Sequence, residues 1–370
     1  MDTVPKGLDG VIVDETAVCL ADRSTDRLYY RGYAIEDLAQ HASYEEVAYL
    51  LLRGGLPSSG ELEAYTRSVA GQRDLPAPLL AVLDQLPASA DPMDVLRTGM
   101  SVLGTLEPET KEGGVDAVAR RLMGCLPGLL LHWFHRKEGR PPTAMGAAAG
   151  AAGNLLGLLH GRPPTPVEER AIEVSLIVYA EHDFNASTFA ARVATSTLSD
   201  AYSAYVAAIS ALRGPLHGSA NAAVLRFLTR FKSADEAESA VRDMLKQKAR
   251  IPGFGQRAYS KSDPRNAINK EWARRLADAK GDTVLYEIAD RIEAVLRSER
   301  GMFANLDYYT ALIYHACGLP VPLFPPMFMI ARIAGLAAHI AEQRAGNRII
   351  HPSSRYVGPA PRAYVPLAQR

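Results

Sequence analysis

The chain has 370 residues, of which 48% are hydrophobic, and its 41 Lys and Arg balance its 41 Asp and Glu. This length and composition allow a substantial core, in one large domain or two moderate ones. Zero formal net charge argues against nucleic acid or a membrane surface as partner, because neither polyanion would attract the whole molecule. The cysteines, Cys19, Cys125 and Cys317, are far apart, so we expect buried thiols in a reducing cytosol.

The first residues, MDTVPKGLDG, lack the apolar stretch of a signal peptide. The longest uncharged run, 143–161, is rich in glycine and has too few strongly apolar residues to span a bilayer comfortably. A closely packed helix, in which small side chains let neighbouring elements approach, is the better interpretation. We therefore predict a soluble, cytoplasmic protein with no membrane partner.

Alternating apolar and polar residues near the N-terminus predict a small β ribbon over 10–22 and 27–33. Helical periodicity governs the rest of the chain, and the predicted fold class is all-α. The first clear helix, 43–54, has Ser43 and Glu46 in the order of a capping box and ends at two glycines. Four more long helices are predicted at 166–184, 233–250, 281–300 and 327–346.

Three short stretches combine polar residues that could carry chemistry. In AEHDFNAST, His182 and Asn185 are three residues apart, which would place them on one face of a helix. In GPLHGSAN, His217 lies in a turn that leads into an alanine-rich helix. In ANLDYYTAL, Asp307 is a lone carboxylate among apolar neighbours, where a pKa tends to rise toward a value useful for a general base.

Each candidate also has a structural interpretation. His182 alone is more typical of a structural histidine, His217 can serve only its turn, and Asp307 can be a helix N-cap. Arg332 differs, because a charge within an apolar helical run needs a partner, and an anionic ligand would supply one. His339, on the same run, is expected in the core or at an interface. The sequence shows no zinc-site spacing, nucleophile elbow, phosphate-binding loop or dinucleotide fingerprint, and we predict no metal site.

A glycine-rich loop followed by cations occupies 251–265, IPGFGQRAYSKSDPR. Gly253 and Gly255 would let the backbone approach a ligand closely. Arg257 and Lys261 would favour an anionic ligand. The glycines alone are a weak signal.

Six groups of motifs lie in order along nearly the whole chain: GLDGVIVDETAVCLAD…YYRGYAIEDLA, DPMDVLRTGMSVLG, EHDFNASTFAARV, GPLHGSAN, IPGFG…DPR and LFPPMFMIARIAGLAAHIAEQ…YVGP. On these motifs the chain resembles the citrate synthase family of bacterial type, including the 2-methylcitrate synthases, which act on propionyl-CoA. The resemblance implies a two-domain, nearly all-helical fold and a homodimer or higher oligomer. The large domain would comprise 1–217 and 318–370, and a small domain, 218–317, would close over the substrates and exclude water.

The family reaction is a Claisen-type condensation of an acyl-CoA with a 2-oxo acid, followed by hydrolysis of the thioester. Acyl-CoA is a co-substrate, and no permanently bound cofactor is implied. By resemblance, Asp307 removes the α-proton of the acyl-CoA and His217 hydrogen-bonds the thioester oxygen. His182 would bind the oxo acid, and Arg265 and Arg332 would bind its carboxylates through their planar donors.

The resemblance also implies two groups of binding residues. The oxo-acid pocket would include Asn185 and Phe328. The CoA-binding group would comprise Ile251, Pro252, Gly253, Phe254, Gly255, Arg257 and Lys261.

Three positions depart from the family pattern. Gln256 replaces the histidine that assists protonation of the ketone oxygen, and a Gln amide donates a hydrogen bond but cannot deliver a proton near neutral pH. Losing acid catalysis costs about 10²–10⁴ in rate. His351, in His351-Pro352-Ser353, replaces an arginine that reaches across the dimer to an oxo-acid carboxylate. Ser260 replaces a Lys or Arg that meets CoA phosphates, and neighbouring cations would compensate.

Two hypotheses follow from this pattern. Two of the changes fall at the oxo-acid site, whereas His217 and Asp307 are retained. We therefore favour an active condensing enzyme that uses oxaloacetate slowly or takes a different 2-oxo acid. The alternative is a non-catalytic paralogue that binds CoA or an oxo acid and has a regulatory role.

Overall fold

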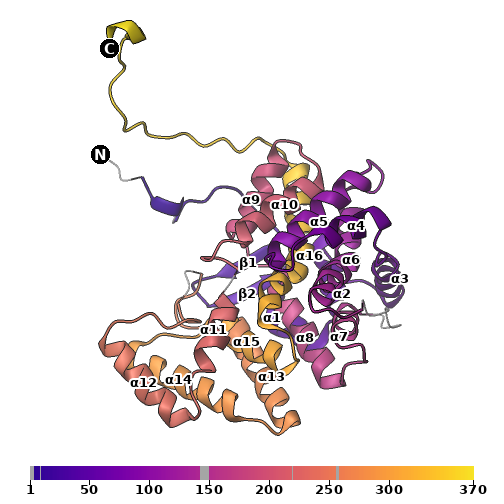
Figure 1. Ribbon diagram of the computed structural model, residues 1–370, viewed down its shortest axis with the longest axis vertical. Coiled ribbons are helices and arrows are strands. Elements are labelled where there is room, and N and C mark those ends of the chain that lie inside the picture. Colours follow the sequence, from indigo (N-terminus) through magenta and orange to yellow (C-terminus); the bar gives the residue numbers. More distant parts are fainter. Residues whose placement is uncertain (1–3, 9, 142–149, 219, 256–257) are drawn as a thin grey trace.

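A computed structural model describes residues 4–8, 10–141, 150–218, 220–255 and 258–370 of the chain. In these residues helices form almost all of the regular structure, and a three-stranded antiparallel ribbon lies near the N-terminus (Figure 1). The predicted all-α class with a minor β ribbon is confirmed. The first predicted strand, 10–22, was too long, since the ribbon begins at Cys19.

The ribbon consists of β1 (Cys19–Asp22), β2 (Arg27–Tyr30) and β3 (Tyr33–Ala34), in the order β1-β2-β3. The helices of the described residues are α1 (Ile35–His41), α2 (Tyr44–Arg53), α3 (Ser59–Ala70), α4 (Ala77–Gln85), α5 (Pro92–Leu106), α6 (Gly114–Lys137), α7 (Ala151–His160), α8 (Pro166–Tyr179), α9 (Ala186–Ser196), α10 (Ala201–Leu212), α11 (Ala220–Leu228), α12 (Ala234–Lys246), α13 (Pro264–Lys280), α14 (Val284–Arg300), α15 (Leu306–Ala316) and α16 (Phe324–Ala345). Three short 3₁₀ turns lie at Lys6–Leu8, Val321–Leu323 and Leu367–Gln369.

Local capping signals set most of the helix ends as predicted. Ser43 precedes α2 and accepts the backbone N–H of Glu46, and Gly54 ends the helix at a φ of 83°. The prediction over 166–184 was too long, since α8 ends at Tyr179. The chain turns there because Asn185 is the N-cap of α9.

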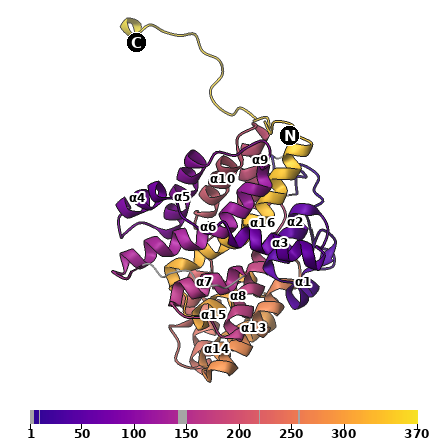
Figure 2. The same ribbon diagram turned by 90° about the vertical axis from the view of Figure 1, so that its right-hand side faces the viewer.

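Helix α16 is the core helix of the fold and contacts α2, α6, α8 and α9. With the short turn before it, it is long and apolar enough to cross a membrane, but it is mostly buried inside the protein, as a core helix would be. Both views show α16 passing between the other helices (Figures 1 and 2). A residue on its inner face is therefore held rigidly.

Two regions stand apart from this core. Helices α11 to α15 gather at one end of the molecule in Figure 1, and Figure 2 shows α13, α14 and α15 at the same end. This is the grouping expected of a small domain over 218–317. Its boundaries stay a prediction. Residues 351–370 are exposed, and the C-terminal segment extends away from the helices.

Candidate active site

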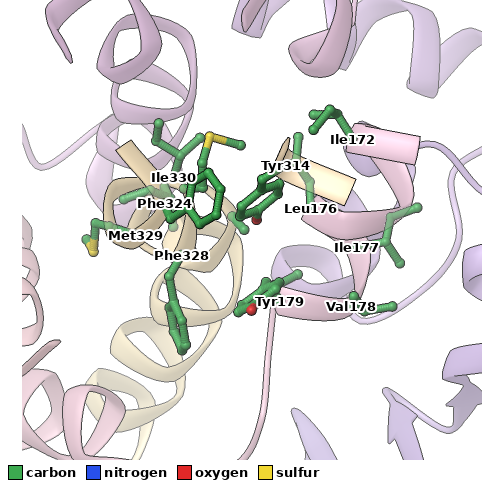
Figure 3. Packing of buried hydrophobic residues seen from close by; sticks show 14 of the residues in the cluster. Ile172, Leu176, Ile177, Val178, Tyr179, Tyr314, Phe324, Phe328, Met329 and Ile330 are labelled. Atoms are coloured by element: carbon green, nitrogen blue, oxygen red, sulfur yellow. The ribbon is translucent and has the colours of Figure 1, made fainter. Parts of the chain in front are cut away.

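Side chains from three separate motifs meet around the ring of Phe328 on α16. The rings of Tyr179 and His217 approach it edge-on, with centroids 5.0 and 5.6 Å away. The guanidinium carbon of Arg332, one turn further along α16, lies 4.6 Å from the ring centroid. Figure 3 shows Phe328 and Tyr179 facing each other from α16 and α8. The fold thus brings together His217, Phe328 and Arg332, which sequence analysis placed in one site.

Asp307 lies in the first turn of α15, beside this cluster. Its backbone N–H donates to the side chain of Asn305, which is the N-cap, so the interpretation of Asp307 itself as the N-cap is wrong. The hydroxyl of Tyr179 donates to the Asp307 carboxylate at 2.6 Å. Burial raises the pKa of Asp307, while the Tyr179 hydrogen bond and the charge of Arg265 oppose that rise. A carboxylate in this state is a stronger base than a solvated one.

His217 is held by the N-terminal turn of α9. The backbone N–H of Ser187 donates to His217 Nε2 at 3.3 Å, and the Ser187 hydroxyl oxygen lies 3.0 Å from the same atom. Burial and the charge of Arg332 lower the pKa of His217 to about 4. The ring is therefore neutral at pH 7, and because Nε2 accepts, Nδ1 carries the proton. His217 can donate one hydrogen bond to a ligand oxygen without itself carrying a charge.

His182 and Arg265 form a second group around Tyr259. His182 Nε2 lies 3.0 Å from the Tyr259 hydroxyl, and the Arg265 guanidinium carbon lies 5.9 Å from the Tyr259 ring centroid. Burial and the charges of Arg265 and Arg332 hold the pKa of His182 well below its ordinary value. Arg265 also donates through Nε and Nη2 to the carboxylate of Asp263, at 3.0 and 2.8 Å. That arginine already has a counter-charge.

Arg332 is differently placed, as a buried cation whose donors are only partly used. Its Nε donates to the carbonyl of Tyr179 at 2.7 Å, whereas its buried Nη1 has no hydrogen-bond partner in the described part of the chain. The nearby Glu181 carboxylate is hydrogen-bonded to His339 at 2.9 Å, which places His339 in the core. Burial lowers the pKa of Arg332. An anionic ligand would supply the missing partner.

Both glycines of IPGFG have positive φ angles, and Gly253 is also required by the packing against α15. Gly253 and Gly255 have φ angles of 84° and 86°, and a Cβ on Gly253 would lie 2.6 Å from the ring of Tyr308. The carbonyl of Gly253 accepts the N–H of Asn305 at 2.9 Å, and Phe254 packs against Tyr308 with ring centroids 4.8 Å apart. The loop is therefore fixed to the helix that carries Asp307.

For the other predicted CoA-binding residues, the structure gives only their exposure. Ile251 is buried, Pro252 is half-buried and Lys261 is exposed. Gln256 and Arg257 lie outside the described residues. The predicted contacts of this loop with CoA stay a prediction.

The arrangement of His182 and Asn185 differs from the one that the sequence pattern indicated. His182 and Asn185 do not share a helix face, because the chain between α8 and α9 is a turn with Asp183 at a φ of 54°. The Asn185 side chain caps α9 and donates back to the carbonyl of Asp183, so it holds the turn that carries His182. His351 is exposed on the C-terminal extension, and its predicted contact with the partner's site stays a prediction.

Four residues that position the site were missed by sequence analysis. Tyr179, Ser187, Tyr259 and Asp263 each hydrogen-bond a predicted site residue. Asp263 in Asp-Pro-Arg and Ser187 two residues after Asn185 lie within the quoted motifs and could have been noticed. The partners of the two tyrosines are 128 and 77 residues away in the sequence, and no local pattern reveals them.

Comparison with known proteins gives a consistent result. A family model described as "Citrate synthase, C-terminal domain" matches residues 7–353. The chain is 44% identical to a 2-methylcitrate synthase of Shewanella oneidensis over 98% of this chain and 97% of the relative. It is 39% identical to citrate synthase 2 of Bacillus subtilis over the full length of both.

The solved structures agree with these relatives. Citrate synthase from the archaeon Thermoplasma acidophilum, determined as a ternary complex with carboxymethyl coenzyme A and oxaloacetate, superimposes with a TM-score of 0.92 at 32% identity over the full length of both chains. Both the matched length and the identity with the relatives are large. The chain belongs to the citrate synthase family.

Proposed function

We propose that this protein condenses an acyl-CoA with a 2-oxo acid and hydrolyses the resulting thioester. In enzyme-class terms it is an acyltransferase that converts the acyl group into an alkyl group on transfer. The observation that carries the proposal is the cluster around Phe328, which combines a neutral histidine, His217, and a cation with an unpaired donor, Arg332, and is joined through Tyr179 to a half-buried base, Asp307. The two enzymes named among its relatives give the non-catalytic alternative no support.

The proposed chemistry assigns proton removal to Asp307 and a hydrogen bond to His217. Asp307 takes a proton from the α-carbon of the acyl-CoA, and the proton on His217 Nδ1 hydrogen-bonds the thioester oxygen as the enol forms. The α-carbon then attacks the ketone carbon, and a carbon–carbon bond forms as the ketone C=O π bond opens. The ketone oxygen takes up one proton, which balances the proton that Asp307 removed. Water next cleaves the thioester to release CoA and a carboxylate. Neither side chain needs to change its charge before the reaction begins.

The oxo acid is proposed to bind between Arg332, His182 and Arg265. The unpaired Nη1 of Arg332 makes it the stronger candidate for a carboxylate contact. We also propose a cytoplasmic homodimer with a closing small domain, in which His351 on the exposed C-terminal extension reaches the partner's site. Small molecules are its proposed ligands, with neither nucleic acid nor a membrane as partner.

Thiol release tests this function directly. Acetyl-CoA and propionyl-CoA are each incubated with a panel of 2-oxo acids, and free CoA is measured with a thiol reagent. We expect CoA release that depends on both substrates for at least one pair. Measurable binding of acyl-CoA or oxo acid without release from any pair would support the non-catalytic alternative instead.

Substituting Tyr179→Phe is expected to shift the pH dependence of turnover. The Tyr179 hydroxyl stabilises the ionised Asp307, so its removal raises the pKa of that carboxyl further. Because the ionised form is the base, the acidic limb of the kcat/KM profile should move to higher pH by about one to two units. Ser175→Ala, which removes the partner of the neighbouring Tyr314 hydroxyl, should leave the limb in place. An unchanged acidic limb in Tyr179→Phe would show that the Tyr179 hydroxyl does not control the ionisation of the catalytic base.

The double substitution Gln256→His with His351→Arg tests whether the acceptor has changed. If these positions define an altered oxo-acid site, the double variant should form citrate from oxaloacetate about 10²-fold faster than wild type, since both acid catalysis and a carboxylate contact are restored. Each single variant serves as a control and should gain less. Wild-type citrate formation at an ordinary kcat of about 10 s⁻¹ would show that Gln256 is merely tolerated.

A further inference from the structure

The carboxylate of Asp26 lies in the turn between β1 and β2 and is bound by three consecutive backbone N–H groups from a distant segment. Ser260 and Lys261 donate their N–H groups to it at 2.7 Å each, and Ser262 donates at 3.2 Å. The Ser260 hydroxyl adds a contact at 3.2 Å. Successive N–H groups that converge in this way form an anion-binding concavity. Here a carboxylate 234 residues away in the sequence fills it.

The Asp26 backbone is itself in an uncommon conformation. Its φ is 52°, in the left-handed region that residues other than Gly, Asn and Asp rarely adopt. The three N–H groups lower the pKa of Asp26, led by that of Ser260, so the carboxylate is ionised at neutral pH. A charged acceptor makes each of these hydrogen bonds stronger than one between neutral groups.

The bound segment, 260–262, lies between two residues that hold the proposed oxo-acid ligands. On one side, the Tyr259 hydroxyl lies 3.0 Å from His182 Nε2. On the other side, Asp263 makes two hydrogen bonds to Arg265. In contrast, the Tyr179 contact that holds Asp307 does not involve this segment. The contact between Asp26 and 260–262, the anchor, is therefore continuous with the oxo-acid side of the site. It is not isolated from the acyl-CoA side, because Lys261 is a predicted CoA contact and Asp263 accepts the N–H of Leu306, next to Asp307, at 3.2 Å.

We propose that Asp26 is a positioning residue that fixes the segment 260–262 and, through Tyr259 and Asp263, sets the affinity of the site for the oxo acid. This inference rests on the proposed function for its substrate, but the anchor itself can be measured without turnover. Loss of the carboxylate should raise the KM for the oxo acid by about tenfold and change kcat by less than about twofold, since one charge-assisted hydrogen-bond network is lost away from the reacting atoms.

The test uses Asp26→Ala, Asp26→Asn and a matched control, Asp22→Ala. Asp22 lies on the same hairpin and accepts hydrogen bonds only from Ser24 and Thr25 among the described residues, so its removal disturbs the turn without touching 260–262. The Asp26→Asn variant would keep the shape and tolerate the positive φ, but its amide NH₂ group would face backbone N–H donors of 260–262. It should behave like Asp26→Ala rather than like wild type.

Two measurements are made on each full-length variant. Hydrogen exchange followed by mass spectrometry of a peptide covering 258–263 should show exchange of these amides about tenfold faster in both Asp26 variants and unchanged in Asp22→Ala. Steady-state kinetics should show the rise in oxo-acid KM in the same variants. Unchanged exchange, or faster exchange with an unchanged KM, would overturn the proposal.

Failure of the proposed function would look different. If the wild-type protein released no CoA from any substrate pair, exchange would still test the anchor, and oxo-acid binding measured by calorimetry would replace KM. Weaker oxo-acid binding in the Asp26 variants would then uphold the role of Asp26 while the condensation itself failed. Equal binding in all variants would reject the role.

Discussion

Asp307→Asn is expected to lower kcat by about 10²–10⁴-fold, because the amide cannot take the α-proton of the acyl-CoA. Asn is nearly the same size as Asp and can still accept the hydrogen bond from Tyr179, so both substrates should still bind. The measurement is kcat from CoA release, together with oxo-acid and acyl-CoA affinities from calorimetry. A variant that binds both substrates and fails to turn them over would identify Asp307 as the base.

The thermal stability of Asp307→Asn distinguishes the loss of the base from misfolding of the variant. The pKa of Asp307 is raised in the folded protein, so ionising this carboxyl above its unfolded pKa costs folding free energy. Asp307→Asn removes that cost and should have a Tm at pH 7 equal to or higher than that of wild type. Asp243→Asn, the same substitution at a surface position on α12, is the control and should keep wild-type kcat. Wild-type kcat in Asp307→Asn would exclude Asp307 as the base.

Arg332→Gln is expected to raise the KM for the oxo acid by about 10²–10³-fold, as removal of one partner from a buried charge pair does in other complexes. Arg332 has a buried Nη1 without a partner among the described residues and lies against Phe328 at the centre of the site. The effect should fall on the oxo acid and spare the affinity for acyl-CoA. Steady-state kinetics with each substrate varied in turn would show this selectivity.

The same helix provides a control for Arg332. Arg344, near the C-terminal end of α16, pairs with Glu109 and is less deeply buried, so Arg344→Gln should leave both KM values unchanged. Burial lowers the pKa of Arg332, so its buried charge costs folding free energy in the unliganded protein. Replacing it should therefore be close to neutral for stability. An equal rise in both KM values would indicate general damage to the site.

The class of fold and the family could be predicted from the sequence because both depend on patterns that are continuous along the chain. Periodicity and caps place α2, α12 and α14 within a few residues. The start of α16 was placed at Met327, whereas the helix begins at Phe324. Pro325 and Pro326 lie in the first turn of this helix. Proline is tolerated there, because the N–H groups of the first turn have no intrahelical partner.

The arrangement of the site could be predicted only in part. His217, Asp307 and Arg332 were selected from local composition and from the resemblance. The structure places His217 and Arg332 against Phe328 and joins Asp307 to them through Tyr179. Their hydrogen-bond partners depend on how distant helices pack. The anchor at Asp26 is the extreme case, since its partners follow 234 to 236 residues later.

The most direct test of the central claim is identification of the product formed from acyl-CoA and oxaloacetate by the wild-type protein. Mass spectrometry should detect citrate from acetyl-CoA or 2-methylcitrate from propionyl-CoA, with one CoA released for each molecule of product. A different 2-oxo acid in the panel that gives the corresponding hydroxy acid at the same ratio would also support condensation and would identify the altered acceptor. Release of CoA without any condensation product, or no release with any pair, would contradict it.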